Sequence, residues 1–179
     1  GGLVYADYIT TVSDTYAYEI QTPEYGEGLD GLLSARHFDM QGIVNGIDYM
    51  NYNPEIDAKL YVNYNADNWR QKKALNKERL QQDLGLAVDK GKFMIGLVSR
   101  LTEQKGLDLI NYVMEGIVDE HTQLVVIGTG EPQYENMFRH FDWKYSDKVS
   151  ANIYYSEELS HKIYAACDAF LMPSAFEPC

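Results

Sequence analysis

The segment FMIGLVSRLTEQKGLDLINYVMEGI, residues 93–117, decides the fold because it joins a strand pattern to a helix pattern through a single loop. Residues 93–98 are a short apolar run bounded by turn formers, which predicts a buried strand. Residues 107–117 carry a helical pattern, and residues 99–106 form the loop between the two. A strand that runs through a loop into a helix is the unit from which parallel sheets are built.

The same alternation extends through the rest of the chain. Further strand patterns lie at residues 8–12, 41–44, 124–127, 149–154 and 169–172, and further helical patterns lie at residues 14–20, 68–84, 131–141 and 157–166. Continuous apolar strands that alternate with helices predict an α/β fold, a Rossmann-like doubly wound parallel sheet with helices on both faces. In such sheets ligands bind beyond the carboxyl ends of the strands, so the loops that lead into helices are the places to seek chemistry.

The clearest helical pattern spans residues 68–84. Gly85 supplies a C-terminal stop. The apolar residues that approximate a 3.6-residue period, and so predict the buried face, are Trp69, Ala74, Leu75, Leu80 and Leu84.

Length and composition indicate one globular domain over residues 1–179. The chain is 45% hydrophobic with a mean hydropathy of −0.37, and no linker divides it. The Tyr/Asn-rich residues 49–68 are expected to form a long surface loop. No apolar run reaches the roughly 18 to 20 residues that span a bilayer, and the first residues do not resemble a signal peptide, so we expect a cytoplasmic protein with no membrane partner.

The charge balance excludes some partners. The formal net charge is −12 and the sequence pI is near 4.6, which would repel a phosphate backbone, so nucleic acid is not expected to bind. An anionic ligand would need cations placed at its own site. The two cysteines do not indicate a disulfide framework, and the four histidines are scattered without ligand spacing, so no metal site is expected.

The two ends suggest a piece of a longer protein. The chain begins Gly1-Gly2 without an initiator Met, and it ends in a strand and loop with no helix to cover that strand. We therefore expect further sequence after Cys179.

The first loop that could carry chemistry is SRLTEQKG, residues 99–106. Arg100 and Lys105 are two cations, five residues apart, beside the start of a helix. A guanidinium and an ammonium in this position can converge on one diphosphate. A solvated loop in which Arg100 pairs with Glu103 or Asp108 fits the same pattern.

The second loop is IGTGE, residues 127–131, which follows another strand. Gly128 and Gly130 are candidate ligand-binding residues, but a dinucleotide fingerprint would need a third glycine where Gln133 stands. The pattern also fits a tight turn from strand to helix. An NAD-dependent dehydrogenase is therefore a weak alternative.

The third loop is FEPC, residues 176–179, after the last strand. The Glu177 carboxylate on such a loop can accept hydrogen bonds from sugar hydroxyls or stabilise a cationic sugar transition state. A lone glutamate is equally compatible with a solvated surface position, so its role depends on the residues around it.

Taken in order, several stretches resemble the glycogen/starch synthase family almost from end to end. The stretches that carry the resemblance lie at residues 6–13, 22–33, 44–48, 96–106, 126–131 and 173–179. Members of the family have two Rossmann-like domains that face each other in the GT-B arrangement, and they transfer glucose from a nucleotide sugar to the non-reducing end of an α-1,4-glucan with retention. The chain resembles the C-terminal, donor-binding domain, without the N-terminal domain that completes the catalytic site.

The resemblance implies roles for particular residues. Arg100 and Lys105 match the basic pair that contacts the donor diphosphate, and Glu177 matches the essential acidic residue near the transferred glucose. Tyr155 matches an aromatic residue that stacks on adenine, and Asn45 matches a position near the donor cleft. The implied donor is ADP-glucose, with no tightly bound cofactor and no metal, and the implied partners are an α-glucan and the missing N-terminal domain.

Two alternatives to this function stay open. UDP-glucose users share much of the same loop set, so a UDP-glucose-dependent retaining glycosyltransferase is one alternative. The isolated chain, which we expect to be inactive in glucosyl transfer, could also act as a non-catalytic nucleotide-binding module.

Overall fold

The computed structural model describes residues 1–179, and their contacts form two compact units. The larger unit comprises residues 48–176, and the smaller one comprises residues 1–47 together with residues 177–179. The sequence predicted a single domain over residues 1–179. The structure differs because the strands form two separate sheets, one in each unit.

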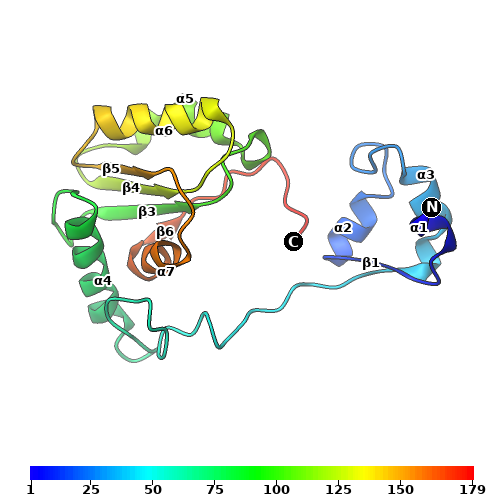
Figure 1. The fold of residues 1–179 in the computed structure, drawn as a ribbon, viewed down its shortest axis with the longest axis horizontal. Coiled ribbons are helices and arrows are strands. Elements are labelled where there is room, and N and C mark those ends of the chain that lie inside the picture. The colour runs from blue at the N-terminus through cyan, green and yellow to red at the C-terminus, as the bar shows by residue number, and fades with distance from the viewer. The chain divides into compact units, whose positions relative to one another are not determined.

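The larger unit is built on a four-stranded parallel sheet (Figure 1). Its strands, in the spatial order β5-β4-β3-β6, are β5 Val149–Asn152, β4 Thr122–Ile127, β3 Phe93–Val98 and β6 Ala169–Phe170. The chain passes from β3 through β4 to β5 on one side and then returns to place β6 on the other side of β3. This order confirms the predicted doubly wound sheet.

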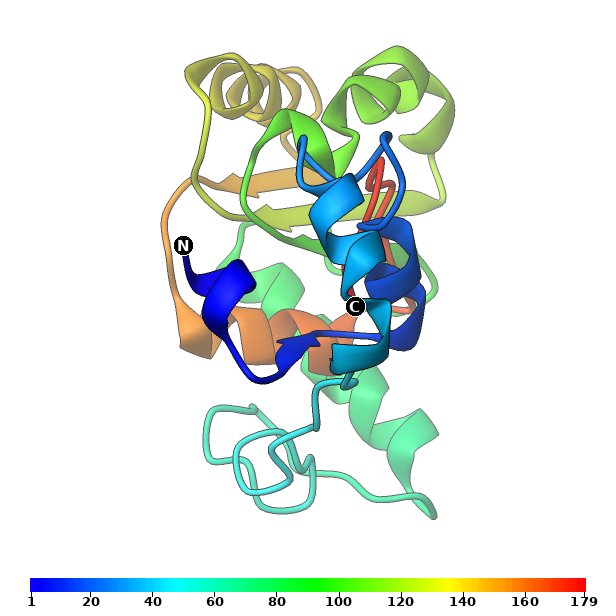
Figure 2. The ribbon, with the colours of Figure 1, turned by 90° about the vertical axis from the view of Figure 1, so that its right-hand side faces the viewer.

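Helices cover both faces of this sheet (Figure 1). One face carries α5 Leu107–Ile117 and α6 Pro132–Lys144, and the other carries α4 Trp69–Asp83 and α7 Glu157–Ala166. Figure 2 shows the same layers along another direction, with α5 and α6 above the strands and the orange α7 below them. The helices are all too short or too polar to span a lipid bilayer.

Alternate residues of β4 fill two separate cores. Leu124 and Val126 pack into a cluster with Met114 of α5 and Phe138 of α6. On the opposite face, Val125 and Ile127 pack with Leu80 of α4 and Ile163 of α7, and all of these residues are at most 2% exposed. The side chains of a strand alternate between faces, so a continuous apolar run is the pattern that a sheet buried on both faces requires.

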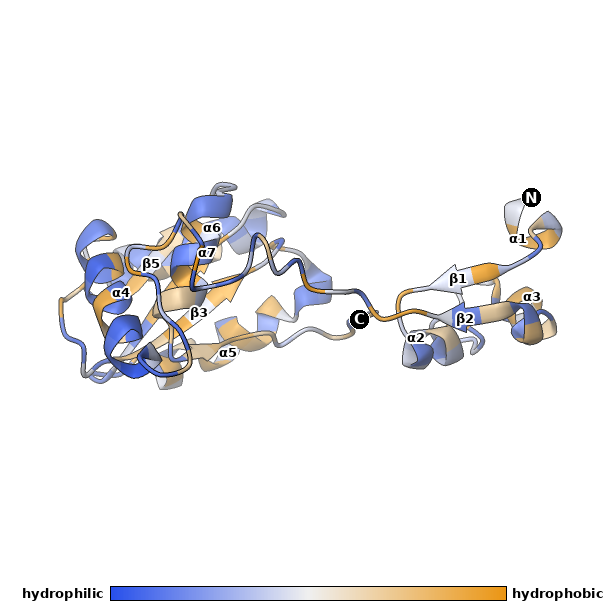
Figure 3. Cartoon of the chain, turned by 90° about the horizontal axis from the view of Figure 1, so that it is seen from below, coloured by the Kyte–Doolittle hydropathy of each residue, from blue (hydrophilic) through white to orange (hydrophobic).

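Helix α4 spans residues 69–83, one residue shorter at each end than predicted, and its buried face differs in part. Leu80 is buried as predicted, whereas Trp69 and Leu75 are 45% and 44% exposed. Polar residues take their place, and Figure 3 shows how hydrophilic this helix is. The Lys77 ammonium lies 2.5 Å from the Asp168 carboxylate. Leu84 also packs against the core as predicted, whereas the predicted face is wrong at Trp69 and Leu75, where buried polar side chains with partners replace the apolar stripe.

The Gln81 side chain extends this polar packing of α4. Its amide nitrogen donates to Gln123 Oε1 at 2.7 Å and to the carbonyl of Asp89 at 2.8 Å. Gln123 is a fully buried residue of β4. The contact ties the helix to the centre of the sheet through satisfied hydrogen bonds, which is how buried amides are accommodated.

The smaller unit contains a two-stranded parallel sheet. Its strands are β1 Ile9–Thr11 and β2 Met40–Gly42, and its helical segments are α1 Gly2–Tyr5, α2 Asp14–Glu19, α3 Asp30–Ala35 and the 3-10 turn η1 His37–Asp39. Ser13 caps α2, because its hydroxyl oxygen accepts from the Tyr16 amide at 3.0 Å. The same hydroxyl donates to the carbonyl of Pro178 at 2.7 Å, which joins residues 177–179 to this unit.

Residues 49–68 contain no helix or strand, as the sequence predicted for a surface loop. The loop is anchored to α7 by one buried pair, in which His161 Nδ1 lies 2.6 Å from Asp57 Oδ2, with side chains 2% and 6% exposed. The Tyr52 ring stacks on the His161 ring with centroids 4.6 Å apart. Lys59 and Glu157 add an exposed ion pair at 3.0 Å.

Replacing Asp57 by Ala is expected to lower the free energy of unfolding by roughly 1–3 kcal/mol, because it leaves the buried His161 ring nitrogen without its partner. Urea denaturation of the whole chain measures this change. Lys59→Ala is the matched control in the same loop, and it should have little effect because its ion pair is exposed. Equal losses in the two variants would show that the buried pair does not anchor the loop.

Candidate functional site

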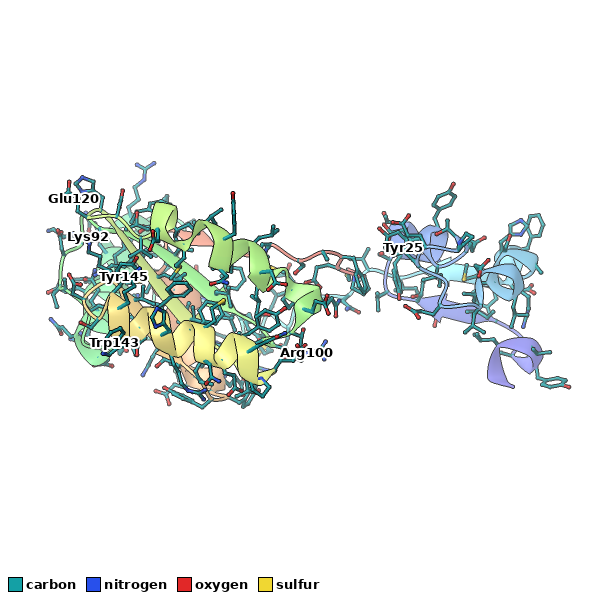
Figure 4. The ribbon with its side chains drawn as sticks, turned by 90° about the horizontal axis from the view of Figure 1, so that it is seen from above. Tyr25, Lys92, Arg100, Glu120, Trp143 and Tyr145 are labelled. Atoms are coloured by element: carbon teal, nitrogen blue, oxygen red, sulfur yellow. The ribbon has the colours of Figure 1, made fainter.

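A pocket of about 230 Å³ lies at the carboxyl ends of β3, β4 and β5. Three loops line it, with Val98, Ser99 and Arg100 from the first, Ile127, Gly128 and Thr129 from the second, and Tyr154, Tyr155, Ser156 and Ser160 from the third and α7. Figure 4 shows Arg100 at the opposite end of the larger unit from Lys92, Glu120 and Tyr145, which lie where the three strands begin. The pocket is therefore at the edge where ligands bind in doubly wound sheets.

The loop after β3 continues the strand pairing beyond the end of β3. The Ser99 amide donates to the carbonyl of Ile127 at 3.2 Å, and the Leu101 amide donates to the carbonyl of Thr129 at 2.9 Å. Leu101 is completely buried in the core below. Side chains alternate along an extended chain, so an inward Leu101 directs its neighbour Arg100 outward, and Arg100 is exposed.

Arg100 forms no ion pair with Glu103 or Asp108, which was the alternative that the sequence left open. Asp108 instead accepts a hydrogen bond from the Tyr134 hydroxyl at 3.2 Å. The backbone amide of Glu103 donates to Glu131 Oε1 at 3.2 Å. The Arg100 guanidinium thus remains available to a ligand at the pocket.

Lys105 lies farther along the same loop but does not line the pocket. It ends the 3-10 turn η2 Glu103–Lys105 and precedes Gly106, the N-cap residue of α5. Gly106 has left-handed backbone angles of φ 65° and ψ 27°, and a Cβ there would lie 2.0 Å from the carbonyl oxygen of Pro173. The turn therefore requires a glycine immediately after Lys105.

The two glycines after β4 allow close backbone contact between neighbouring loops. A Cβ on Gly128 would lie 1.9 Å from the carbonyl oxygen of Ser99, and one on Gly130 would lie 2.1 Å from that of Leu101. The Gly130 amide donates to Glu135 Oε1 at 3.0 Å, and this hydrogen bond holds the pKa of the Glu135 carboxyl below its ordinary value. The glycine pair serves a tight turn, one of the two interpretations that the sequence allowed.

The third wall of the pocket comes from the end of β5 and the start of α7. Tyr155 is 84% exposed and Tyr154 is 49% exposed, so both rings are accessible. Ser156 caps α7, because its hydroxyl oxygen accepts from the Leu159 amide at 3.1 Å. Ser160 lies one turn later, and its hydroxyl donates to the carbonyl of Ser156 at 2.8 Å.

The structure brings together part of the predicted set. Arg100, Gly128 and Tyr155 line one pocket, and Gly130 is bridged to Leu101 beside it. Asn45 and Glu177 belong to the smaller unit, so their approach to this pocket stays a prediction.

The sequence patterns did not single out five polar residues that line the pocket, Ser99, Thr129, Tyr154, Ser156 and Ser160. The sequence does contain a pattern that could have indicated Ser156 and Ser160, because serines four residues apart at the start of a helix lie on the same face.

Two family models match different parts of the chain. The model described as "Glycosyl transferases group 1" matches residues 77–179, and the model described as "Starch synthase catalytic domain" matches residues 1–35. The first match covers more than half of the chain and nearly all of it lies in the larger unit.

Curated relatives align with the whole chain. It is 68% identical over 179 residues to the glycogen synthase of Lachnospira eligens and 56% identical over 179 residues to that of Thermotoga maritima. Each alignment covers 100% of this chain and 37% of the relative. The chain therefore spans little more than a third of the length of these relatives.

Solved structures also resemble the chain. The catalytic domain of starch synthase IV from Arabidopsis thaliana, bound to ADP and acarbose, matches with a TM-score of 0.93 and 37% identity, over 100% of this chain and 37% of that one. Anabaena HepE in complex with UDP-glucose matches with a TM-score of 0.61 and 15% identity, over 99% of this chain and 41% of that one. The second likeness shows a shared fold.

Replacing Gly128 by Ala is expected to disrupt the pocket, because the added Cβ collides with the Ser99 carbonyl and forces the two loops apart. Thermal unfolding and nucleotide titration of the variant should both show a loss. The matched control is Gly116→Ala in α5, where a Cβ meets nothing within 4 Å. Alanine favours a helix over glycine by about 0.5–1 kcal/mol, so the control should be slightly stabilised. Wild-type behaviour of Gly128→Ala would contradict the close contact.

Proposed function

We propose that the pocket of this chain, which belongs to the group 1 glycosyl transferases, binds the nucleoside diphosphate of a sugar donor. The whole protein would then transfer glucose from ADP-glucose to the non-reducing end of an α-1,4-glucan with retention. The observation that carries the proposal is the convergence of Arg100, Gly128 and Tyr155 on one pocket at the carboxyl edge of the parallel sheet.

Local positive charge supports diphosphate binding in this strongly acidic chain. Two other lysines are paired elsewhere, Lys77 with Asp168 and Lys144 with Glu115. Arg100 and Lys105 lie in the loop that links β3 to α5. The backbone amides at the start of α5 favour the binding of an anion there. A guanidinium can bind phosphate oxygens bidentately, and an ammonium adds a point charge.

The same cations would act in catalysis. As the bond between glucose and diphosphate breaks, the sugar becomes cationic and the leaving diphosphate gains negative charge. Arg100 and Lys105 would stabilise that charge more strongly in the transition state than in the bound donor, which is how such groups lower a barrier. Glu177 would support the positive sugar through its carboxylate, and Tyr155 would stack on the base.

The donor in this proposal is ADP-glucose rather than UDP-glucose. The starch synthase whose structure was solved with ADP is 37% identical to this chain, whereas HepE, solved with UDP-glucose, is 15% identical. The α-glucan acceptor and the N-terminal partner domain belong to the same proposal, as does Asn45 at the donor cleft. The cytoplasmic location stays a prediction from the sequence.

Arg100→Ala should weaken ADP binding by about tenfold to a hundredfold, because a charge-assisted hydrogen bond to phosphate is lost. Isothermal titration of the whole chain measures the affinity, and thermal unfolding should be unchanged because Arg100 is exposed. Arg79→Ala, an exposed arginine of α4, is the control and should bind ADP normally. Titration with UDP in the same series should give weaker binding, and a preference for UDP would overturn the proposed donor.

Glu177→Gln should reduce glucosyl transfer by roughly a hundredfold in a protein of the full length of the relatives, while ADP affinity changes little. The substitution keeps the shape of the side chain and removes its charge. Turnover of radiolabelled ADP-glucose into glycogen is the measurement, and the 179-residue chain alone should bind ADP without transferring glucose. Near-normal turnover in the variant would rule out an electrostatic role for Glu177.

A further inference from the structure

Three hydroxyl groups that line the pocket donate hydrogen bonds to protein oxygens. Ser99 Oγ donates to the carbonyl of Arg100 at 2.8 Å, and Ser160 Oγ donates to the carbonyl of Ser156 at 2.8 Å. The Tyr154 hydroxyl donates to Asn152 Oδ1 at 3.3 Å. A hydroxyl carries one hydrogen and two acceptor lone pairs, so each of these oxygens offers a ligand acceptor sites alone.

Three backbone amides around the same pocket also have protein partners. The Gly128 and Tyr154 amides both donate to the carbonyl of Asn152, at 3.2 and 2.9 Å, and the Ser99 amide donates to the carbonyl of Ile127 at 3.2 Å. These donors complete the ends of the sheet. The Ser99, Tyr154 and Ser160 oxygens therefore offer the pocket acceptor sites, which favour a ligand group that donates hydrogen bonds.

Ser160 is the acceptor that lies on a helix packed against the sheet. It lies in the first turns of α7, beside the buried residues Leu159 and His161. Its hydrogen bond to the Ser156 carbonyl is the back-bond that serines form within helices, and Ser156 is itself fixed as the helix cap. A polar atom on a packed helix is positioned more accurately toward a ligand than a polar atom on a loop.

We propose that Ser160 selects the nucleobase, with its Oγ accepting a hydrogen bond from an exocyclic amino group such as the 6-amino group of adenine. This inference rests on the proposed function of the pocket as the site for a nucleoside diphosphate. A base with a carbonyl oxygen at the same position would place two acceptors against each other with no hydrogen between them. Uracil and hypoxanthine both present such an oxygen, and a site built for a donor rejects them.

The test compares ADP with inosine 5′-diphosphate, which differ mainly by a 6-oxo group in place of the 6-amino group. The wild-type chain should bind ADP about tenfold more tightly than the inosine nucleotide, as titration calorimetry would show. Ser160→Ala should weaken ADP binding by roughly three- to tenfold, the value of one neutral hydrogen bond, and should bind the inosine nucleotide at least as tightly as the wild type, because the opposing acceptor is gone. Ser160→Thr keeps a hydroxyl that can form the same back-bond, so it should retain the preference for ADP.

Two controls make the result specific. Alanine is a good helix former, so Ser160→Ala should keep the fold, and undiminished binding of the inosine nucleotide verifies this directly. Ser146→Ala, an exposed serine in the turn after α6, should preserve the wild-type ratio of the two affinities.

The outcomes separate this inference from the function on which it rests. An equal ratio of ADP to inosine nucleotide affinity in the wild type and Ser160→Ala overturns the role of Ser160. If both nucleotides still bind and Arg100→Ala weakens both, the proposed diphosphate site stands without it. If neither nucleotide binds, or Arg100→Ala weakens neither, both proposals fall together.

Discussion

Backbone contact between the loops that follow β3 and β4 is the constraint on which the candidate site depends. Gly128 and Gly130 permit it, because any side chain at either position would collide with a carbonyl oxygen of the neighbouring loop. The contact extends the strand pairing as far as Leu101, which is buried, and so leaves Arg100 exposed at the pocket. Glycines that resemble a nucleotide fingerprint thus position the cation by packing the loops together.

Helix α7 couples the pocket to the loop of residues 49–68. Its first turns supply Ser156 and Ser160 to the pocket, and the next residue, His161, forms the buried pair with Asp57. On its inner side Ile163 is completely buried against the sheet. One helix therefore carries a pocket wall, a core contact and a loop anchor.

Much of the architecture could be predicted because the patterns that specify it are local. The strand over residues 93–98 and the helix over residues 107–117 were predicted with the bounds that the structure has, since a buried apolar run and a 3.6-residue period are both visible within one segment. The short helices α1 and α3 were missed. Segments of four and six residues carry too little periodicity to stand out, and their packing within the smaller unit specifies them instead.

The sequence by itself determined the alternation of strands and helices, the parallel sheet, and the loops that hold Arg100, Lys105 and the glycine pair. Tertiary structure alone decided which polar groups are paired. Lys77 and Gln81 of α4 are buried with Asp168 and Gln123 as partners, and both partners lie far along the chain. The serines of the pocket likewise became visible only when three loops met at one edge. Periodicity depends on neighbours in sequence, whereas the partner of a polar side chain depends on the folded position of distant segments.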